Sequence, residues 1–296
     1  FVKRRFAKLT SWLLALSLVL GLCGSALPAA AADIPAREPA AAEGRERVGG
    51  SEKVHARGFS LMSSGLNVTS ATPQQLAQAL VGSGVTISNV RYQGKEVARG
   101  LFTGGEGIIG FEEGIVLSTG KAVDVVGPNS RPDTTTQHCF GLFCLSRGGD
   151  GDLDDLLPPG QRTYDAAVLS FDFVPETDVV SFQYVFSSEE YNEWVDKGYN
   201  DVFAFFINGV NVATLPHSRT LVSIDNVNLK RNSEYFANNE GGHLNTEMDG
   251  LTIVLSILAA VKPGQKNSMK LAIADVGDRK RDSAVFIRAG SFPSPP

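Results

Sequence analysis

Alternation of apolar and polar residues dominates the second half of the chain. Residues 166–174 (AAVLSFDFV) and 179–186 (VVSFQYVF) both alternate with a period of two, which is typical of half-buried β-strands. Their inward positions are Ala167, Leu169, Phe171 and Phe173 in the first run, and Val180, Phe182, Tyr184 and Phe186 in the second. The short turn PETD between the runs predicts a β-meander step, with the two strands paired side by side.

More strands follow. The runs DVFAFFI and VNVATL flank Asn208-Gly209, the preferred dipeptide of a two-residue type I′ turn, and this predicts a β-hairpin. Residues 251–261, 268–276 and 283–292 are three further apolar runs of strand character. Together with shorter segments they predict about eight to ten strands.

One helix is predicted, near the start of the patterned region. Thr72 has the character of an N-cap, Pro73 of a first helical residue, and Gln75 completes a capping box. Gly82 and Gly84 end the pattern. The sequence therefore predicts an all-β fold, a β-sandwich of jelly-roll type, with one short N-terminal helix and a long loop insertion over roughly residues 126–164.

The first 32 residues differ from the rest. A basic start, an apolar run of 11 residues (WLLALSLVLGL) and the small residues Ala30 and Ala32 predict a secretory signal peptide cleaved before Asp33. The run is too short to span a membrane, and no later segment is long enough. We expect a flexible linker over residues 33–65, a domain over 66–292, and the start of a proline-rich linker at 293–296, leading to a missing C-terminal anchor or domain. Export predicts a secreted or cell-surface protein.

Charge narrows the class of partner. The whole chain has a formal net charge of −5. The predicted signal peptide contains four of the 27 basic residues and no acidic residue, so 23 basic and 32 acidic residues remain after its removal. Such an acidic surface repels nucleic acid and anionic lipid, which excludes both as expected partners. It suits divalent cations, extracellular glycans or protein surfaces.

Two cysteines remain in the exported chain, Cys139 and Cys144, within HCFGLFC. An even pair in an exported protein predicts a disulfide, here closing a short loop. A metal site that combines the pair with His138 is the alternative, but no second pair at zinc spacing supports it.

Familiar catalytic and nucleotide-binding motifs are absent from the sequence. The glycines of GGEGIIG (104–110) match a dinucleotide fingerprint in spacing, but a strand-like segment follows them where that fingerprint needs a helix. We interpret them as a hairpin turn. The sequence contains no G-x-S-x-G elbow and no H-E-x-x-H motif.

Acidic residues at the ends of apolar runs are the remaining candidates. If those strand ends meet at one rim of a sandwich, unpaired carboxylates repel each other and a bound Ca²⁺ relieves the repulsion. The predicted Ca²⁺ ligands are Glu189, Glu190 and Asp201, together with Asp278 or Asp282. A second possible metal loop contains Asp150, Asp152 and Asp154, in an alternation that suits Ca²⁺ but without EF-hand spacing. Solvated acidic loops are the alternative at both places.

Several segments also resemble a known family. SSEEYNEW, YNDVFAFFING and DSAVFIRAGSF are the most specific, and GIVLSTGKAVDVVGPN and YDAAVLSFDFVP extend the likeness. They resemble the choice-of-anchor L domain of bacterial exported proteins over roughly residues 66–292. The resemblance implies a surface-directed domain whose relatives end in different sorting signals. It implies no particular activity.

Three functions remain open. The first is a non-enzymatic β-sandwich that binds a glycan, matrix component or protein, with Ca²⁺ organising its loops. The second is a carbohydrate-active hydrolase that uses Glu189 or Glu190 with Asp201, although adjacent glutamates on an extended loop point to opposite sides and make a poor catalytic pair. The third is a passive structural spacer.

Overall fold

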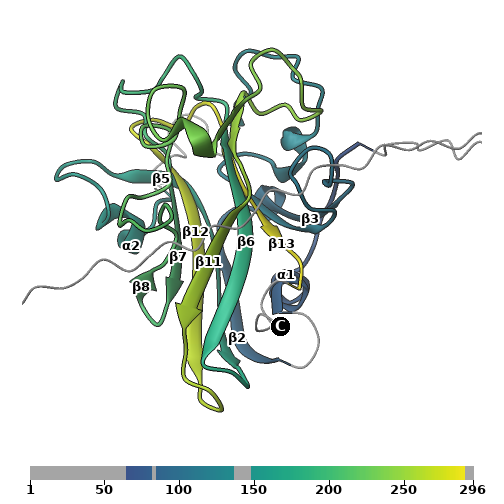
Figure 1. Cartoon of the computed structure of the whole chain (residues 1–296), viewed down its shortest axis with the longest axis vertical. Helices are drawn as coiled ribbons and strands as arrows, with labels where there is room; N and C mark the ends of the chain where they lie inside the picture. The colour runs from purple at the N-terminus through teal and green to yellow at the C-terminus, as the bar shows by residue number, and fades with distance from the viewer. Residues whose placement is uncertain (1–64, 82–84, 137–147, 291–296) are drawn as a thin grey trace, which may run out of the picture. The chain divides into compact units, whose positions relative to one another are not determined.

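Two antiparallel β-sheets pack face to face in the computed structural model, which describes residues 65–81, 85–136 and 148–290 (Figure 1). In spatial order the eight-stranded sheet contains β1 (Asn67–Thr69), β3 (Arg99–Thr103), β4 (Gly114–Ser118), β13 (Ser283–Arg288), β6 (Val179–Ser188), β10 (Gly250–Thr252) and β9 (Phe236–Asn238), with β11 (Leu255–Ala260) also paired to β6. The five-stranded sheet contains β2 (Thr86–Gln93), β5 (Thr163–Val174), β12 (Asn267–Val276), β7 (Val202–Ile207) and β8 (Val210–Asn211). The predicted all-β sandwich is confirmed.

The helical segments are short. They are α1 (Pro73–Val81), α2 (Gly151–Asp154) and the 3-10 turns η1 (Glu96–Ala98), η2 (Ala122–Val125) and η4 (Ser233–Tyr235). Within the described parts of the chain, no helix is long and apolar enough to cross a membrane.

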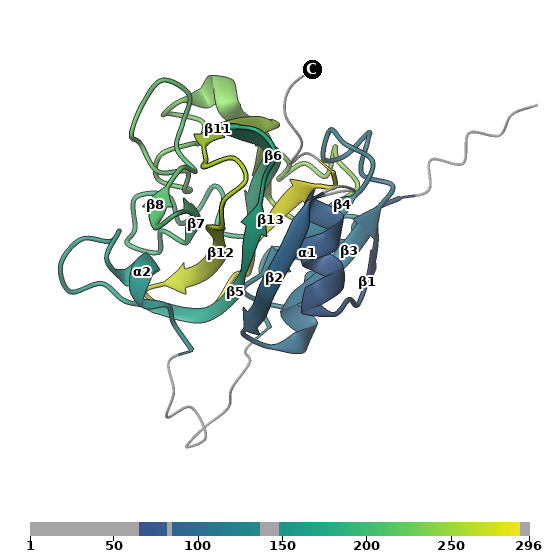
Figure 2. The same cartoon turned by 90° about the horizontal axis from the view of Figure 1, so that it is seen from below.

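The predicted capping box starts α1. The Thr72 backbone N–H donates to Gln75 Oε1 at 2.9 Å, and the Gln75 N–H donates to Thr72 Oγ1 at 3.3 Å. These bonds satisfy two N–H groups that the first helical turn leaves free. The buried face of α1 consists of Leu76, Ala77, Leu80 and Val81. This face packs against β2 and β4, one strand from each sheet, so α1 bridges the sandwich on one side (Figure 2).

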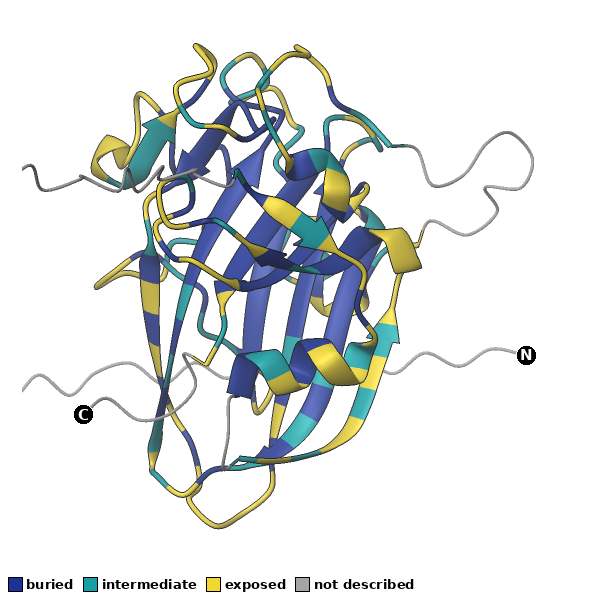
Figure 3. Cartoon of the chain, turned by 90° about the vertical axis from the view of Figure 1, so that its right-hand side faces the viewer, coloured by how far each residue is buried: buried dark blue, intermediate teal, exposed yellow. Residues whose placement is uncertain are grey.

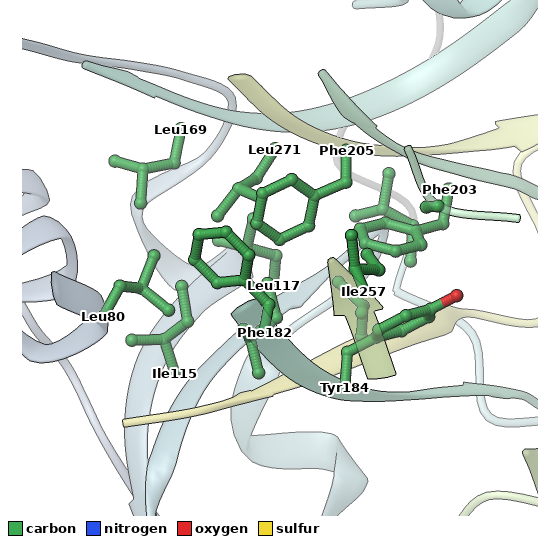
Figure 4. Close-up of a cluster of buried hydrophobic side chains, with 14 of the residues drawn as sticks. Leu80, Ile115, Leu117, Leu169, Phe182, Tyr184, Phe203, Phe205, Ile257 and Leu271 are labelled. Atoms are coloured by element: carbon green, nitrogen blue, oxygen red, sulfur yellow. The ribbon is translucent and has the colours of Figure 1, made fainter. Parts of the chain in front are cut away.

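Aromatic rings fill the space between the sheets (Figure 4). Phe182 of β6 lies 4.5 Å from Phe205 of β7, measured between ring centroids, and Tyr184 lies 5.3 Å from Phe203. Each pair joins one sheet to the other, and burial of each such ring contributes about 1.5–3 kcal/mol. The central strands, such as β4, β7 and β13, are buried along most of their length, whereas the edge strand β2 and the loops contain many exposed residues (Figure 3).

The predicted meander of residues 166–174 and 179–186 is wrong in its pairing. Both runs form strands, β5 and β6, and their alternation is as predicted, but the strands belong to different sheets. The turn at 175–178 therefore crosses from one sheet to the other. Both strands have an apolar inner face, and two such faces bury more area when they pack across the core than when they lie side by side.

Two other predicted strands differ in extent. Residues 251–261 form two strands, β10 and β11, separated at Ile253, which is 44% exposed. The hairpin of β7 and β8 has the predicted turn, with φ of 50° at Asn208 and 80° at Gly209, but β8 is only two residues long. Residues 104–110 lie in the connection between the antiparallel strands β3 and β4, as predicted.

The outer face of the five-stranded sheet is partly covered. Val168 of β5, predicted to face outward, is 6% exposed because Leu153 of α2 packs over this part of the sheet, together with Leu156 and Leu157. The alternation places Val168 on the outer face correctly, but alternation alone does not show that α2 covers this face.

Candidate functional site

Strand ends from both sheets meet at one rim, at the top of Figure 1. Ser188, the last residue of β6, pairs with Ser283, the first residue of β13. The Ser283 hydroxyl lies 2.8 Å from the Ser188 hydroxyl and donates to Asp201 Oδ2 at 2.7 Å. Asp201 directly precedes β7 of the other sheet. The end of β6 and the starts of β13 and β7 therefore lie together at this rim.

Three of the acids form an inner acidic group, defined as Glu190, Asp201 and Asp275. Each is at most 1% exposed. Asp201 Oδ1 accepts from the Val276 N–H at 2.9 Å, but Glu190 Oε2 and Asp275 Oδ1 are buried without a hydrogen-bond partner. A buried carboxylate oxygen without a partner is energetically costly, so this group needs a proton or a cation to neutralise it.

The pKa values of the inner acidic group are raised because ionised carboxylates are costly to bury. Burial, followed by the charges of Asp201 and Asp275, raises the pKa of Glu190 to about 12, with Arg281 acting in the opposite direction. Burial is also the largest cause that holds the pKa values of Asp201 and Asp275 well above the usual aspartate range. Three mutually close, desolvated carboxyls cannot all be ionised without an added positive charge.

A second set, the loop-bound acidic group, consists of Glu189, Glu247, Asp249 and Asp282. Residues 129–136 supply most of its hydrogen-bond donors. Glu247 accepts from the backbone N–H groups of Ser130 and Arg131 at 3.1 and 3.0 Å. Asp282 accepts from the Thr136 N–H at 2.9 Å.

The donors of the loop do not satisfy the whole group. Glu189 Oε2 accepts from the Thr134 N–H at 3.3 Å, but Glu189 Oε1 is buried without a partner. Burial, then the charge of Asp249, raises the pKa of Glu189 to about 9. Burial raises the pKa values of Asp249 and Asp282 to about 7.

The predicted Ca²⁺ ligands are therefore divided between two places. Glu190 and Asp201 belong to the inner acidic group, whereas Glu189 and Asp282 belong to the loop-bound acidic group. Asp278 is partly exposed beside the inner group, and its Oδ1 accepts from the Lys280 N–H at 2.9 Å.

Sequence reasoning left three buried acids out of the predicted ligand set. They are Asp275, Glu247 and Asp249. Asp249 directly precedes β10, as Asp201 precedes β7 and Asp282 precedes β13. An acidic residue immediately before an apolar strand is therefore the sequence signal that places Asp249 in the candidate site together with Asp201 and Asp282.

Metal binding at the rim stays a prediction. Among the residues that the structure describes, no group of three or more His, Cys, Asp or Glu side chains is arranged so that it could hold a metal ion. A cation in the inner acidic group would therefore require these side chains to rotate toward one point, with nearby hydroxyl or backbone oxygens completing its coordination.

The second possible metal loop has protein partners for its oxygens. Asp150 caps α2, and its two carboxylate oxygens lie 2.7 Å from Lys270 Nζ, which also lies 2.6 Å from Asp152 Oδ2. Asp154 Oδ1 accepts from the Thr163 N–H at 2.7 Å. Protein donors thus occupy oxygens that a cation would need. Cys139 and Cys144 lie outside the described residues, as do the predicted signal peptide and most of the predicted linker.

Comparison with known proteins gives one match. A family model described as Choice-of-anchor L domain matches residues 65–293, which is close to the range 66–292 expected from the sequence. No match was found among curated proteins or among solved structures.

Proposed function

The chain belongs to the choice-of-anchor L domain family, and on that premise we propose that it is an exported, surface-associated, non-catalytic binding module stabilised by Ca²⁺ at the rim of its sandwich. Its ligand is an extracellular glycan, matrix component or protein. The observation that supports Ca²⁺ binding is the inner acidic group, in which Glu190 and Asp275 each have a buried carboxylate oxygen without a hydrogen-bond partner.

Export is supported by the N-terminal pattern. The basic start, the apolar run and the small residues before Asp33 are the three parts of a signal peptide. N-terminal sequencing of the secreted chain should give a start within about five residues of Asp33.

Extracellular Ca²⁺ suits the chemistry of the rim. It is a hard cation that takes six to eight oxygen ligands from carboxylates, carbonyls and hydroxyls. The inner acidic group supplies carboxylates from the end of β6, the start of β7 and the end of β12. One ion would neutralise carboxylates from both sheets and so hold the two sheets together at the rim.

A binding role fits the rim better than hydrolysis. A glycoside hydrolase needs two carboxyl groups that a sugar can reach from opposite sides of the scissile bond. Glu189, Glu190 and Asp201 are at most 1% exposed, so a substrate has no access to them. Release of reducing sugar from polysaccharides by the wild type, abolished in Glu190→Gln, would favour the hydrolase instead.

Thermal unfolding in CaCl₂ and in EDTA tests the calcium part. A ligand that binds only the folded state stabilises it by about 2.7 kcal/mol at a hundredfold excess over its Kd. We expect a higher Tm in Ca²⁺, and we expect Asp275→Asn and Asp201→Asn to reduce the difference.

The matched control is Glu193→Gln, which removes an exposed carboxylate three residues after Glu190. It should leave the Ca²⁺ response intact. Equal Tm values of the wild type in Ca²⁺ and EDTA would show that protons, not calcium, neutralise the rim.

A further inference from the structure

A groove crosses the outer face of the five-stranded sheet, on the side of α2 and β8 in Figure 1. It encloses about 840 Å³. Its floor and walls come from all five strands and from the segment around α2. Strands form a more rigid base for a binding site than loops do, so the positions of these side chains are fixed before a ligand arrives.

One row of side chains runs the full width of the groove. Successive cross-strand partners connect β2, β5, β12, β7 and β8, and they are Arg91, Ser170, Lys270, Phe206 and Asn211. Four inter-strand spacings of about 4.8 Å give the row a length of about 19 Å. The groove therefore suits an extended polymer better than a compact small molecule.

Charges in the groove largely neutralise each other. Lys270 Nζ contacts Asp150 and Asp152 at 2.7 and 2.6 Å. Asp172 accepts from Asn89 Nδ2 at 2.7 Å and lies 3.2 Å from Lys266 Nζ. These contacts leave no strong field of one sign, which a polyanion or a polycation would require.

Hydrogen-bond donors and acceptors nevertheless remain exposed in the groove. Arg91 is exposed on β2, and Ser268 is exposed on β12. Beside these polar groups, the 65% exposed Val210 gives the groove an apolar part, and Phe206, which is 7% exposed beneath Lys270, forms part of its floor.

We propose that this groove binds a neutral polysaccharide chain across the five strands. Sugar hydroxyls both donate and accept hydrogen bonds, so they match mixed donors and acceptors, and the C–H faces of sugar rings match the apolar part. The proposal rests on the proposed function as a binding module, for which it names the ligand class and the site.

Affinity electrophoresis tests the assignment with the exported chain and soluble β-glucan, xylan and galactomannan. At least one polysaccharide should retard the wild type. Arg91→Ala removes a guanidinium from the groove, and Ser268→Trp fills the groove, so each should weaken retardation at least tenfold.

Matched controls lie elsewhere on the surface. Arg219→Ala removes an exposed arginine that does not line the groove, and Ser256→Trp adds the same bulk to an exposed position of β11 in the other sheet. Both should bind as the wild type does. The Tm of every variant, measured in Ca²⁺ and in EDTA, reports on folding and on the rim separately.

Three results would overturn the groove assignment: no retardation by any of the three polysaccharides, retardation unchanged in both groove variants, or binding of an extended peptide probe in place of the polysaccharides. An intact calcium response in the same samples would leave the rim proposal standing. Conversely, polysaccharide binding without a calcium response would support the groove and reject the calcium part.

Discussion

The Ser283 hydroxyl donates to Asp201 Oδ2 at 2.7 Å and thereby joins the two sheets at the rim. Ser283 begins β13 of the eight-stranded sheet, and Asp201 precedes β7 of the five-stranded sheet. Both residues are almost completely buried. The bond therefore connects the sheets in a place where water cannot replace the lost donor.

Ser283→Ala should therefore destabilise the domain. Removal of one partner of a buried hydrogen bond leaves the other unsatisfied and costs about 1–3 kcal/mol. Chemical denaturation should show a lower midpoint with an unchanged slope. Ser256→Ala, at an exposed position of β11, is the control and should match the wild type. An unchanged midpoint in Ser283→Ala would mean that Asp201 does not depend on this hydroxyl.

In EDTA, stability should fall as the pH rises. Glu189, Asp249 and Asp282 have folded-state pKa values of about 9, 7 and 7, all raised above the usual values by burial. Above the unfolded-state pKa values, near 4, the folded chain binds more protons than the unfolded chain, so the free energy of unfolding decreases with pH. The stabilisation that these protonated carboxyl groups contribute is complete below about pH 4, and it is lost as the pH passes through about 7 to 9.

Melting curves in EDTA between about pH 5 and about pH 8 measure this loss. Asp249→Asn and Asp282→Asn should flatten the pH dependence, whereas Glu176→Gln, at an exposed residue, should not. Added Ca²⁺ should oppose the fall in Tm at higher pH, because the proposed ion binds the carboxylates of the inner acidic group in their ionised form. A Tm that rises with pH in EDTA would contradict the raised pKa values.

Gly120 leaves no room for a side chain beside Asp282. A Cβ at position 120 would lie 1.6 Å from Asp282 Oδ2 and 2.1 Å from its Cγ. Gly120→Ala should displace this carboxylate from the Thr136 N–H and cost about 1–3 kcal/mol, as overpacking does elsewhere. Gly107→Ala, where a Cβ would meet nothing within 4 Å, is the control for thermal unfolding. Equal Tm values for the two variants would show that Asp282 can move freely.

Loss of the capping box should weaken the docking of α1. Thr72→Ala removes the side chain that accepts from the Gln75 N–H, and loss of such a cap costs about 1 kcal/mol. For a domain of this size that corresponds to a decrease in Tm of about 2–4 °C. Gln74→Ala, at an exposed position in the same turn, should have little effect.

Cys139 and Cys144 should be bonded in the exported protein. The loop that they close is short, so the bond should stabilise the fold by only about 2 kcal/mol. Thiol titration under non-reducing denaturing conditions should find no free thiol from this pair. Two free thiols would exclude the bond.

Local chemistry explains which features the sequence predicts correctly. The capping box of Thr72 and Gln75 and the turn of Asn208 and Gly209 depend on neighbouring residues, and both are present as predicted. Inward positions such as Phe182 also follow from alternation alone. In contrast, the choice between pairing within a sheet and packing across the core depends on distant strands, so the partner of β5 could not be inferred.

The candidate site was partly predictable for the same reason. Acids at strand ends indicated the rim, because strand ends in a sandwich gather there. The separation of Glu189 from Glu190 depends on residues 129–136, more than 50 positions earlier in the chain, whose Thr134 N–H donates to Glu189. No pattern around the two glutamates contains that information.

The positions of the last two strands have a consequence for the order in which the chain can fold. β12 lies between β5 and β7, and β13 lies between β4 and β6, so the latest strands to be synthesised occupy interior places in both sheets. A chain that has emerged only as far as residue 266 lacks the strands that connect the earlier ones. Folding must wait for these long-range pairings, which makes it intrinsically slow. If the chain is exported as proposed, slow folding lengthens the time that it spends in the unfolded state that a translocation channel accepts.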